Sequence, residues 1–153
     1  MVDIHHTSTA NAPVSLMFEY MDDYRMVPKW MFGLSRMEPL SEQTSGVGAV
    51  YDGSMKLGPK TLHSTVEVTR WERDEAIAMS SVKGFVNRST WVFEAVDDEH
   101  TRLRVDFVYE LPCGLAGRAL GKVIEPFVAV AIRHTESQLR EQVERLHAER
   151  GER

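Results

Sequence analysis

The chain has 153 residues, of which 42% are hydrophobic and 27% are charged, and its formal net charge is −5. This length and composition are typical of one globular domain with its own core. The mild negative charge and the lack of a basic block argue against a nucleic-acid partner. The single cysteine, Cys113, excludes an intrachain disulfide and a cysteine-rich metal or iron–sulfur site.

Neither a targeting segment nor a membrane span is recognisable. The first ten residues lack the basic cluster and apolar core of a secretory signal, and the longest apolar run, residues 126–132, is too short to cross a bilayer. We therefore expect a cytoplasmic protein. The sequence does not determine the oligomeric state, and it is compatible with a homodimer.

The N-terminal part of the chain predicts one strand followed by two short helices. Residues 2–9 alternate weakly, as in a strand, and Asn11 is the expected N-cap of a helix that opens at Pro13. Four apolar residues of this helix keep helical spacing: Val14, Met17, Phe18 and Met21. Residues 24–31 predict a second short helix, broken at Pro28.

Residues 33–111 contain only strand-like segments. Their period-two alternation and the short charged turns between them predict an antiparallel meander. The predicted strands cover residues 34–40, 49–57, 62–71, 76–82, 89–95 and 102–110. Together with the first strand they make a curved antiparallel sheet of six to seven strands, so the predicted fold class is α+β.

One long amphipathic helix is predicted for residues 115–146, and residues 147–153 are expected to be a frayed tail. At 100° per residue, one face of this helix collects Leu120, Ile124, Phe127, Val128, Ala131 and Thr135. Pro126 lacks an amide hydrogen and crowds the carbonyl of Lys122, which predicts a kink at this point. Such a helix needs a wide apolar surface, which the sheet provides.

A single helix covers only part of a strongly curved sheet. The space between the two is either filled by large side chains or left as a cavity, and patterning alone favours a filled core. Trp30 and Phe32, where the short helices meet the sheet, would then form a plug over this core; next to a cavity they would border its mouth.

A set of loosely spaced motifs runs through nearly the whole chain: Ala12-Pro13-Val14, Phe18, Asp22-Asp23, Pro28-Lys29-Trp30, Gly46-Val47-Gly48, Trp91-Val92-Phe93-Glu94 and Thr101-Arg102-Leu103. In these motifs the chain resembles the START-like (SRPBCC) superfamily, and most of all its bacterial polyketide cyclase/dehydrase and lipid-transport group. The resemblance implies the helix-grip fold, in which a curved sheet grips the C-terminal helix around a deep apolar cavity. It does not imply one chemistry, because the superfamily includes carriers, receptors, cyclases, hydratases and chaperone regulators.

The resemblance favours a cavity over a filled core and so identifies a candidate ligand-binding wall. This wall comprises Trp30, Phe32, Tyr51, Met55, Met79, Trp91, Phe93, Phe107, Tyr109, Leu120, Ile124, Phe127, Val128, Ala131 and His134. Eight methionines in the chain fit an adaptable apolar pocket.

Three of these side chains bring polar groups that could orient a ligand carbonyl or transfer a proton: His134, Tyr51 and Tyr109. A lone histidine on the flank of a helix is, however, more often merely exposed. We find no nucleophile signature, no nucleotide-binding fingerprint and no set of metal ligands at a credible spacing. The catalytic residues, if there are any, stay unknown, and we expect neither a metal nor another cofactor.

Three functions remain as hypotheses. The first is binding or transport of a hydrophobic small molecule such as a lipid, isoprenoid or polyketide; burial of ~300 Å² of apolar ligand surface contributes roughly 7 kcal/mol before the costs of association. The second is a polyketide cyclase or dehydratase, which needs at least two titratable groups converging on the cavity. The third is a protein-interaction module with a collapsed cavity.

Overall fold

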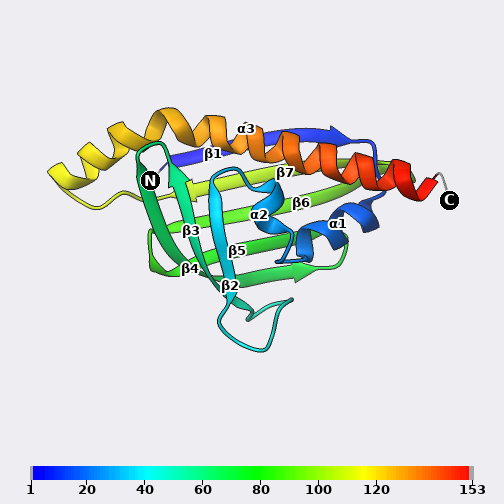
Figure 1. Ribbon diagram of the computed structural model, residues 1–153, viewed down its shortest axis with the longest axis horizontal. Coiled ribbons are helices and arrows are strands. Elements are labelled where there is room, and N and C mark those ends of the chain that lie inside the picture. The colour runs from blue at the N-terminus through cyan, green and yellow to red at the C-terminus, as the bar shows by residue number, and fades with distance from the viewer. Residues whose placement is uncertain (1, 152–153) are drawn as a thin grey trace.

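A seven-stranded antiparallel sheet and one long helix lying across it form the body of the protein (Figure 1). The computed structural model describes residues 2–151. In chain order its elements are β1 (Val2–Ala10), α1 (Val14–Asp22), α2 (Val27–Trp30), β2 (Leu34–Pro39), β3 (Val50–Leu57), β4 (Lys60–Glu72), β5 (Ala76–Gly84), β6 (Asn87–Asp97), β7 (His100–Tyr109) and α3 (Leu115–Gly151). The predicted succession of strand, two short helices, six strands and one long helix is thus confirmed.

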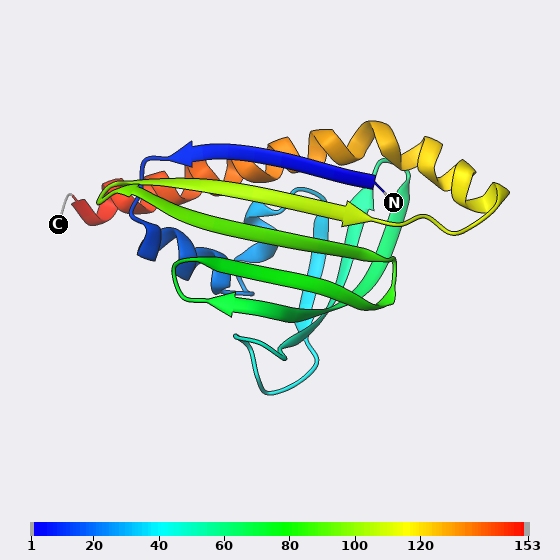
Figure 2. The ribbon, with the colours of Figure 1, turned by 180° about the vertical axis from the view of Figure 1, so that it is seen from behind.

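Strands β2 to β7 form a meander, and the first strand, β1, is added beside the last one. The strand order of the sheet is β1-β7-β6-β5-β4-β3-β2, and all neighbouring strands are antiparallel. β1 pairs with the last strand, β7, with Ile4 opposite Phe107. Figure 2 shows β1, β7, β6 and β5 side by side on the back of the molecule. The two chain-distant strands β1 and β2 therefore form the two edges of the sheet.

The sheet bends between β4 and β5. The register between β4 and β5 shifts twice, between Thr65 and Val66 and again between Val68 and Arg70. Such bulges bend a strand and increase its twist. In Figure 1 the strands β2 and β3 accordingly run steeply across the direction of β5, β6 and β7. The bend turns one face of the sheet into a concave surface.

The two short helices differ in detail from the prediction. The residue before α1 is Pro13, and no side chain caps this helix. The expected capping by Asn11 is wrong, because Pro13 occupies the N-cap position. The main-chain N–H of Asn11 donates to Glu144 Oε2 of α3 at 3.2 Å. Pro28 does not break α2; it lies in the first turn, where the missing amide hydrogen costs no helical hydrogen bond.

The long helix α3 extends further than predicted. It continues to Gly151, so residues 147–151 are helical, whereas residues 152 and 153 of the expected tail lie outside the described residues. Figure 1 shows that α3 changes direction in its yellow-to-orange part, which contains Pro126. The buried side chains of the helix form a stripe along Ile124, Val128, Ala131, Thr135, Leu139 and Val143. A bent helix therefore follows the curved sheet.

Polar contacts fix the position of α3 against α2 and the loop that follows it. Gln142 Nε2 donates to the carbonyl of Lys29 at 2.8 Å, and the main-chain N–H of Phe32 donates to Thr135 Oγ1 at 3.0 Å. On the other flank, the buried carboxylate of Glu136 lies 3.3 Å from His6 Nε2 of β1. Within residues 2–151, no helix combines the length and hydrophobicity needed to cross a membrane.

Candidate functional site

A cavity of about 170 Å³ lies between the concave face of the sheet and α3. Its wall includes residues from all three helices and from β2 to β7. For scale, an engineered apolar cavity of about 150 Å³ stays dry and binds benzene. The space between sheet and helix is therefore large enough for a small hydrophobic molecule.

Nine of the fifteen residues predicted for the ligand-binding wall lie on the cavity. They are Trp30, Phe32, Tyr51, Met55, Met79, Trp91, Phe107, Val128 and Ala131. Trp30 and Trp91 meet edge to face with ring centroids 5.5 Å apart, and both are almost completely buried. Phe32 is 41% exposed although it lines the cavity, so it lies at the opening.

The other six predicted residues lie elsewhere. Phe93 packs edge to face against Phe18 of α1, with centroids 5.3 Å apart, and belongs to the core under α1. Tyr109, Ile124 and Leu120 belong to a second cluster, in which the N-terminal half of α3 packs on the end of the sheet. Phe93 and Tyr109 lie on the sheet face that packs against the helices, and Leu120 and Ile124 lie on the side of α3 that packs against the sheet. Close packing fills the space around all four side chains.

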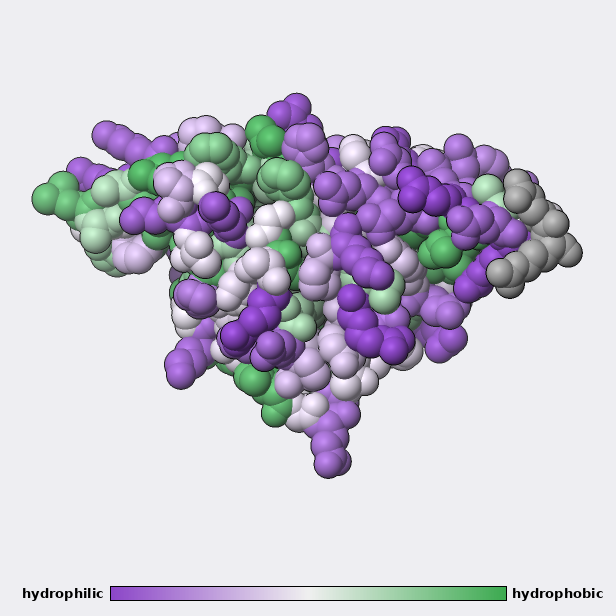
Figure 3. All heavy atoms as spheres, viewed as in Figure 1, coloured by the Kyte–Doolittle hydropathy of each residue, from purple (hydrophilic) through white to green (hydrophobic). Residues whose placement is uncertain are grey.

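Phe127 and His134 lie on the flanks of α3 and not on its buried stripe. Phe127 is 41% exposed and covers the turn between β3 and β4, where a Cβ on Gly58 would lie only 2.3 Å from its ring. In Figure 3, hydrophobic side chains gather over the N-terminal end of α3, where Leu115 is 81% exposed. The exposed ring of His134 stacks on Phe32, with centroids 5.0 Å apart, and so covers a residue of the opening from outside.

Methionine side chains form a substantial part of the wall. Five of the eight methionines in the sequence line the cavity: Met21, Met31, Met37, Met55 and Met79. Thioether side chains have three rotatable bonds and adapt their shape at low cost. The volume of the cavity can therefore change with its occupant.

Sequence reasoning missed the residues of the wall that come from α1, α2 and β2. It also missed three polar residues of the wall, Ser64, Asn87 and Ser89. Met21, Val27 and Leu34 line the cavity because α1 and α2 close one end of it, which alternation along a strand cannot predict. Ser64 and Ser89 lay on strand faces predicted to point inward, so period two could have found them. Asn87 begins β6, and its sequence carried no signal for the site.

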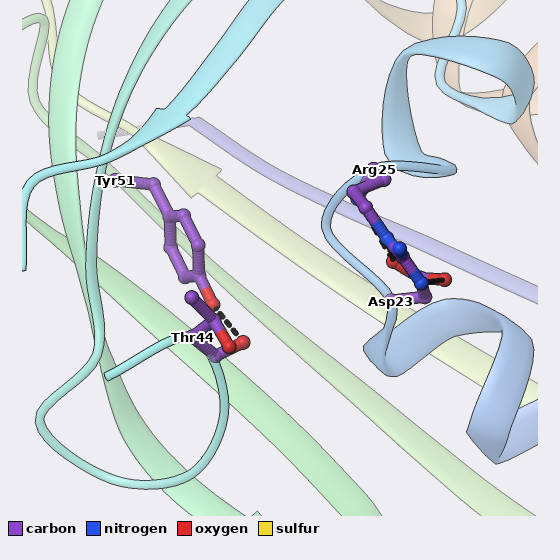
Figure 4. A network of polar contacts seen from close by, with 4 residues as sticks. All are labelled: Asp23, Arg25, Thr44 and Tyr51. Carbon is purple, nitrogen blue, oxygen red and sulfur yellow. Dashed lines mark hydrogen bonds and ion pairs between the residues drawn. The ribbon is translucent and has the colours of Figure 1, made fainter. Parts of the chain in front are cut away.

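Tyr51 is the only side chain with an ionisable group among the described residues that line the cavity. Figure 4 shows its hydroxyl directed at the loop before β3, where it donates to the carbonyl of Thr44 at 2.6 Å. Burial, followed by the nearby Asp22 and Tyr24, raises the pKa of Tyr51 to about 12. The proton of this hydroxyl is thus retained and bound to the main chain. The same figure shows the Asp23–Arg25 ion pair, with Asp23 Oδ1 and Arg25 Nε 3.0 Å apart, in the turn that leads to α2.

Comparison with solved structures shows the same fold in several proteins. A protein from Thermus thermophilus has a TM-score of 0.79 and 18% identity over 93% of this chain and 97% of its own. The Zhui aromatase/cyclase from a Streptomyces species has a TM-score of 0.78 and 18% identity over 94% of each chain. A START superfamily protein from Mycobacterium smegmatis has a TM-score of 0.76 and 15% identity over 94% of this chain and 98% of its own.

At these identities the structural likeness concerns the fold alone, which is the predicted helix-grip fold. A comparison of the sequence with curated proteins finds no match. The sequence model of one family, described as polyketide cyclase / dehydrase and lipid transport, matches residues 1–149. Since this match covers nearly the whole chain, the protein belongs to the polyketide cyclase/dehydrase and lipid-transport family.

Proposed function

We propose that the protein binds and carries a hydrophobic small molecule in the cavity between its sheet and α3. The observation that carries this proposal is the composition of the wall: it is almost entirely apolar, and Tyr51 is its only ionisable side chain among the described residues. Burial of apolar ligand surface at ~25 cal/mol per Å² then supplies the binding free energy. Membership of a family whose description includes lipid transport supports the same function.

The alternative of a cyclase or dehydratase has less support. General acid–base catalysis needs positioned groups that exchange protons with the substrate. Tyr109 and His134 lie off the cavity wall, and the Tyr51 hydroxyl donates to Thr44. A protein-interaction module with a collapsed cavity is disfavoured by the open volume of about 170 Å³.

Native mass spectrometry of freshly purified protein tests whether a compound co-purifies. We expect a non-covalent adduct that is lost on denaturation, and the released compound should keep its mass after incubation with fresh protein. Conversion of that compound to a product of different mass would support the enzyme instead. Absence of any adduct, together with no binding of added hydrophobic probes, would contradict the carrier function.

A matched pair of substitutions on α3 tests the position of the site. Ala131 is buried and lines the cavity, whereas Ala129, two residues earlier, is exposed. We expect Ala131→Phe to fill the cavity and to abolish binding of a fluorescent hydrophobic probe, and Ala129→Phe to leave binding unchanged. Equal probe binding by the two variants would mean that the cavity is not the site.

A further inference from the structure

Three polar side chains interrupt the apolar wall in one place. Ser64 on β4 and Asn87 and Ser89 on β6 all line the cavity. Asn87 Nδ2 donates to Ser64 Oγ at 2.9 Å and to the carbonyl of Phe85 at 2.8 Å, while Ser64 Oγ donates to the same carbonyl at 3.1 Å. Asn87 and Ser89 are two residues apart on one strand, so their side chains leave the same face of the sheet.

This network fixes the orientation of the Asn87 amide. An asparagine amide has two hydrogens, and both are donated, one to Ser64 and one to Phe85. Exchanging its nitrogen and oxygen would place two acceptors, Asn87 Oδ1 and the Phe85 carbonyl, against each other. Among the described residues, Asn87 Oδ1 accepts no hydrogen bond, and the Ser89 hydroxyl neither donates nor accepts one. The cluster therefore presents a fixed acceptor and, beside it, an uncommitted hydroxyl.

Charge decides which ligand group fits this cluster. Within the described chain, no lysine, arginine or histidine lines the cavity. A carboxylate would thus be buried without a cation, which is costly, and the amide hydrogens that could solvate it are already used. A ligand hydroxyl, by contrast, can donate to Asn87 Oδ1 and accept from Ser89 Oγ without any change in the network.

We infer that the cavity selects an uncharged hydrophobic molecule that carries a hydroxyl group, and that Asn87 and Ser89 bind this hydroxyl. The inference rests on the proposed carrier function and narrows it: alcohols and phenols fit the site, whereas free fatty acids do not.

Three probes of similar size and different polar group test this selectivity: 1-naphthol, 1-methylnaphthalene and 1-naphthoate, titrated at pH 7 with tryptophan fluorescence or calorimetry as readout. The two hydrogen bonds of the ligand hydroxyl together correspond to roughly a tenfold gain, so 1-naphthol should bind about ten times more tightly than 1-methylnaphthalene. Naphthoate should bind most weakly. In Asn87→Leu the preference for naphthol should fall to about twofold or less on the same basis, with the affinity for 1-methylnaphthalene nearly unchanged.

Two further variants distinguish the loss of the hydroxyl-binding site from a loss of stability at the turn between β5 and β6. Ser81 Oγ accepts the main-chain N–H of Asn87 at 3.0 Å but does not line the cavity, so Ser81→Ala should weaken the turn and keep the preference for naphthol. Ser89→Ala removes no side-chain hydrogen bond within residues 2–151 and should reduce the preference by roughly threefold. This variant keeps the test decisive if Asn87→Leu does not fold.

Equal affinity of the parent protein for naphthol and 1-methylnaphthalene would overturn the assignment of the hydroxyl site and leave the carrier function standing. Tighter binding of naphthoate than of naphthol would do the same, as would an unchanged naphthol preference in Ser89→Ala and Asn87→Leu. If none of the three probes binds, the carrier function itself fails and this inference with it.

Discussion

Two tryptophans in the cavity wall and one outside it give the protein internal reporters of occupancy. Trp30 and Trp91 line the cavity, whereas Trp71 donates through Nε1 to Asp22 Oδ1 at 2.9 Å and packs against Phe18. In variants that keep a single tryptophan, we expect a bound hydrophobic probe to change the fluorescence of Trp30 or Trp91 and to leave that of Trp71 nearly constant. A response carried by Trp71 alone would contradict the position of the site.

Phe107 and Phe93 lie on neighbouring strands and allow the same truncation to be compared at the cavity and in the packed core. Phe107 lines the cavity and is only partly buried, whereas Phe93 is 4% exposed and packs against Phe18. Truncation of a packed phenylalanine costs about 3–5 kcal/mol, and a residue at an existing void has fewer contacts to lose. We expect Phe93→Ala to lower the free energy of unfolding by that amount and Phe107→Ala by no more than about 2 kcal/mol.

Probe titrations of the same two variants complete this comparison. Phe107→Ala should change the affinity for a hydrophobic probe markedly, and Phe93→Ala should not, because its ring does not reach the cavity. Equal losses of stability in urea melts, with no effect on binding, would indicate that Phe107 is an ordinary core residue.

At the scale of elements, two glycines determine how closely α3 begins against the end of β7. A Cβ on Gly117 would lie 1.5 Å from the carbonyl oxygen of Pro112, which is main chain and cannot yield locally. A Cβ on Gly121 would lie 2.7 Å from Leu111 Cδ1, the tip of a side chain that can move. Although alanine favours a helix by about 1 kcal/mol over glycine, we expect Gly117→Ala to destabilise the protein by about 1–3 kcal/mol.

Gly121→Ala is the matched control and should be close to neutral in the same urea melts, because the gain in helix propensity offsets the small displacement of Leu111. If the two substitutions had the same effect, the close approach at Pro112 would not be what positions α3.

The bend of α3 leads to a separate prediction about the shape of the cavity. Pro126 is exposed and removes one amide donor from the helix interior, where proline costs ~3 kcal/mol. Pro126→Ala should straighten α3 without loss of stability, yet it should alter probe affinity because Val128 and Ala131 follow directly and line the cavity. Unchanged affinity combined with a large loss of stability would contradict a role of the bend in shaping the cavity.

At the scale of the whole molecule, Tyr51 links stability to alkaline pH. Its pKa is raised from 10.0 to about 12 by burial and then by Asp22 and Tyr24. The unfolded chain therefore releases this proton first as pH rises. The stabilisation by protonated Tyr51 is complete below pH 10 and is lost as pH rises towards about 12.

Urea melts between pH 8 and 12 should show this loss, and Tyr51→Phe should reduce its steepness. The stability of Tyr51→Phe should still fall somewhat as pH rises, because burial also raises the pKa values of Tyr20 and Tyr109. If the stability of the parent protein and of Tyr51→Phe depended on pH in the same way, Tyr51 would not contribute to the loss of stability at alkaline pH.

The sequence by itself determined which elements form and which side chains of the strands face inward. Period-two alternation placed Trp91 and Phe107 on the inner face, and short charged turns implied the meander, because both are local properties of the chain. The membership of the family also followed from motifs in the sequence, and the match over residues 1–149 confirms it.

Tertiary structure alone decided what lies opposite each inner residue. Phe93 on β6 and Phe107 on β7 lie on the same face of the sheet by pattern, but α1 covers the first and leaves the second beside a void. Phe127 was predicted on the apolar face of the helix and lies on its flank, because at 100° per residue it stands about 60° away from Ile124, at the edge of the buried stripe, and only contact with the sheet decides how wide that stripe is. The uncharged lining and the free acceptor of Asn87 likewise depend on contacts between β4, the turn at Phe85 and β6, which no local pattern encodes.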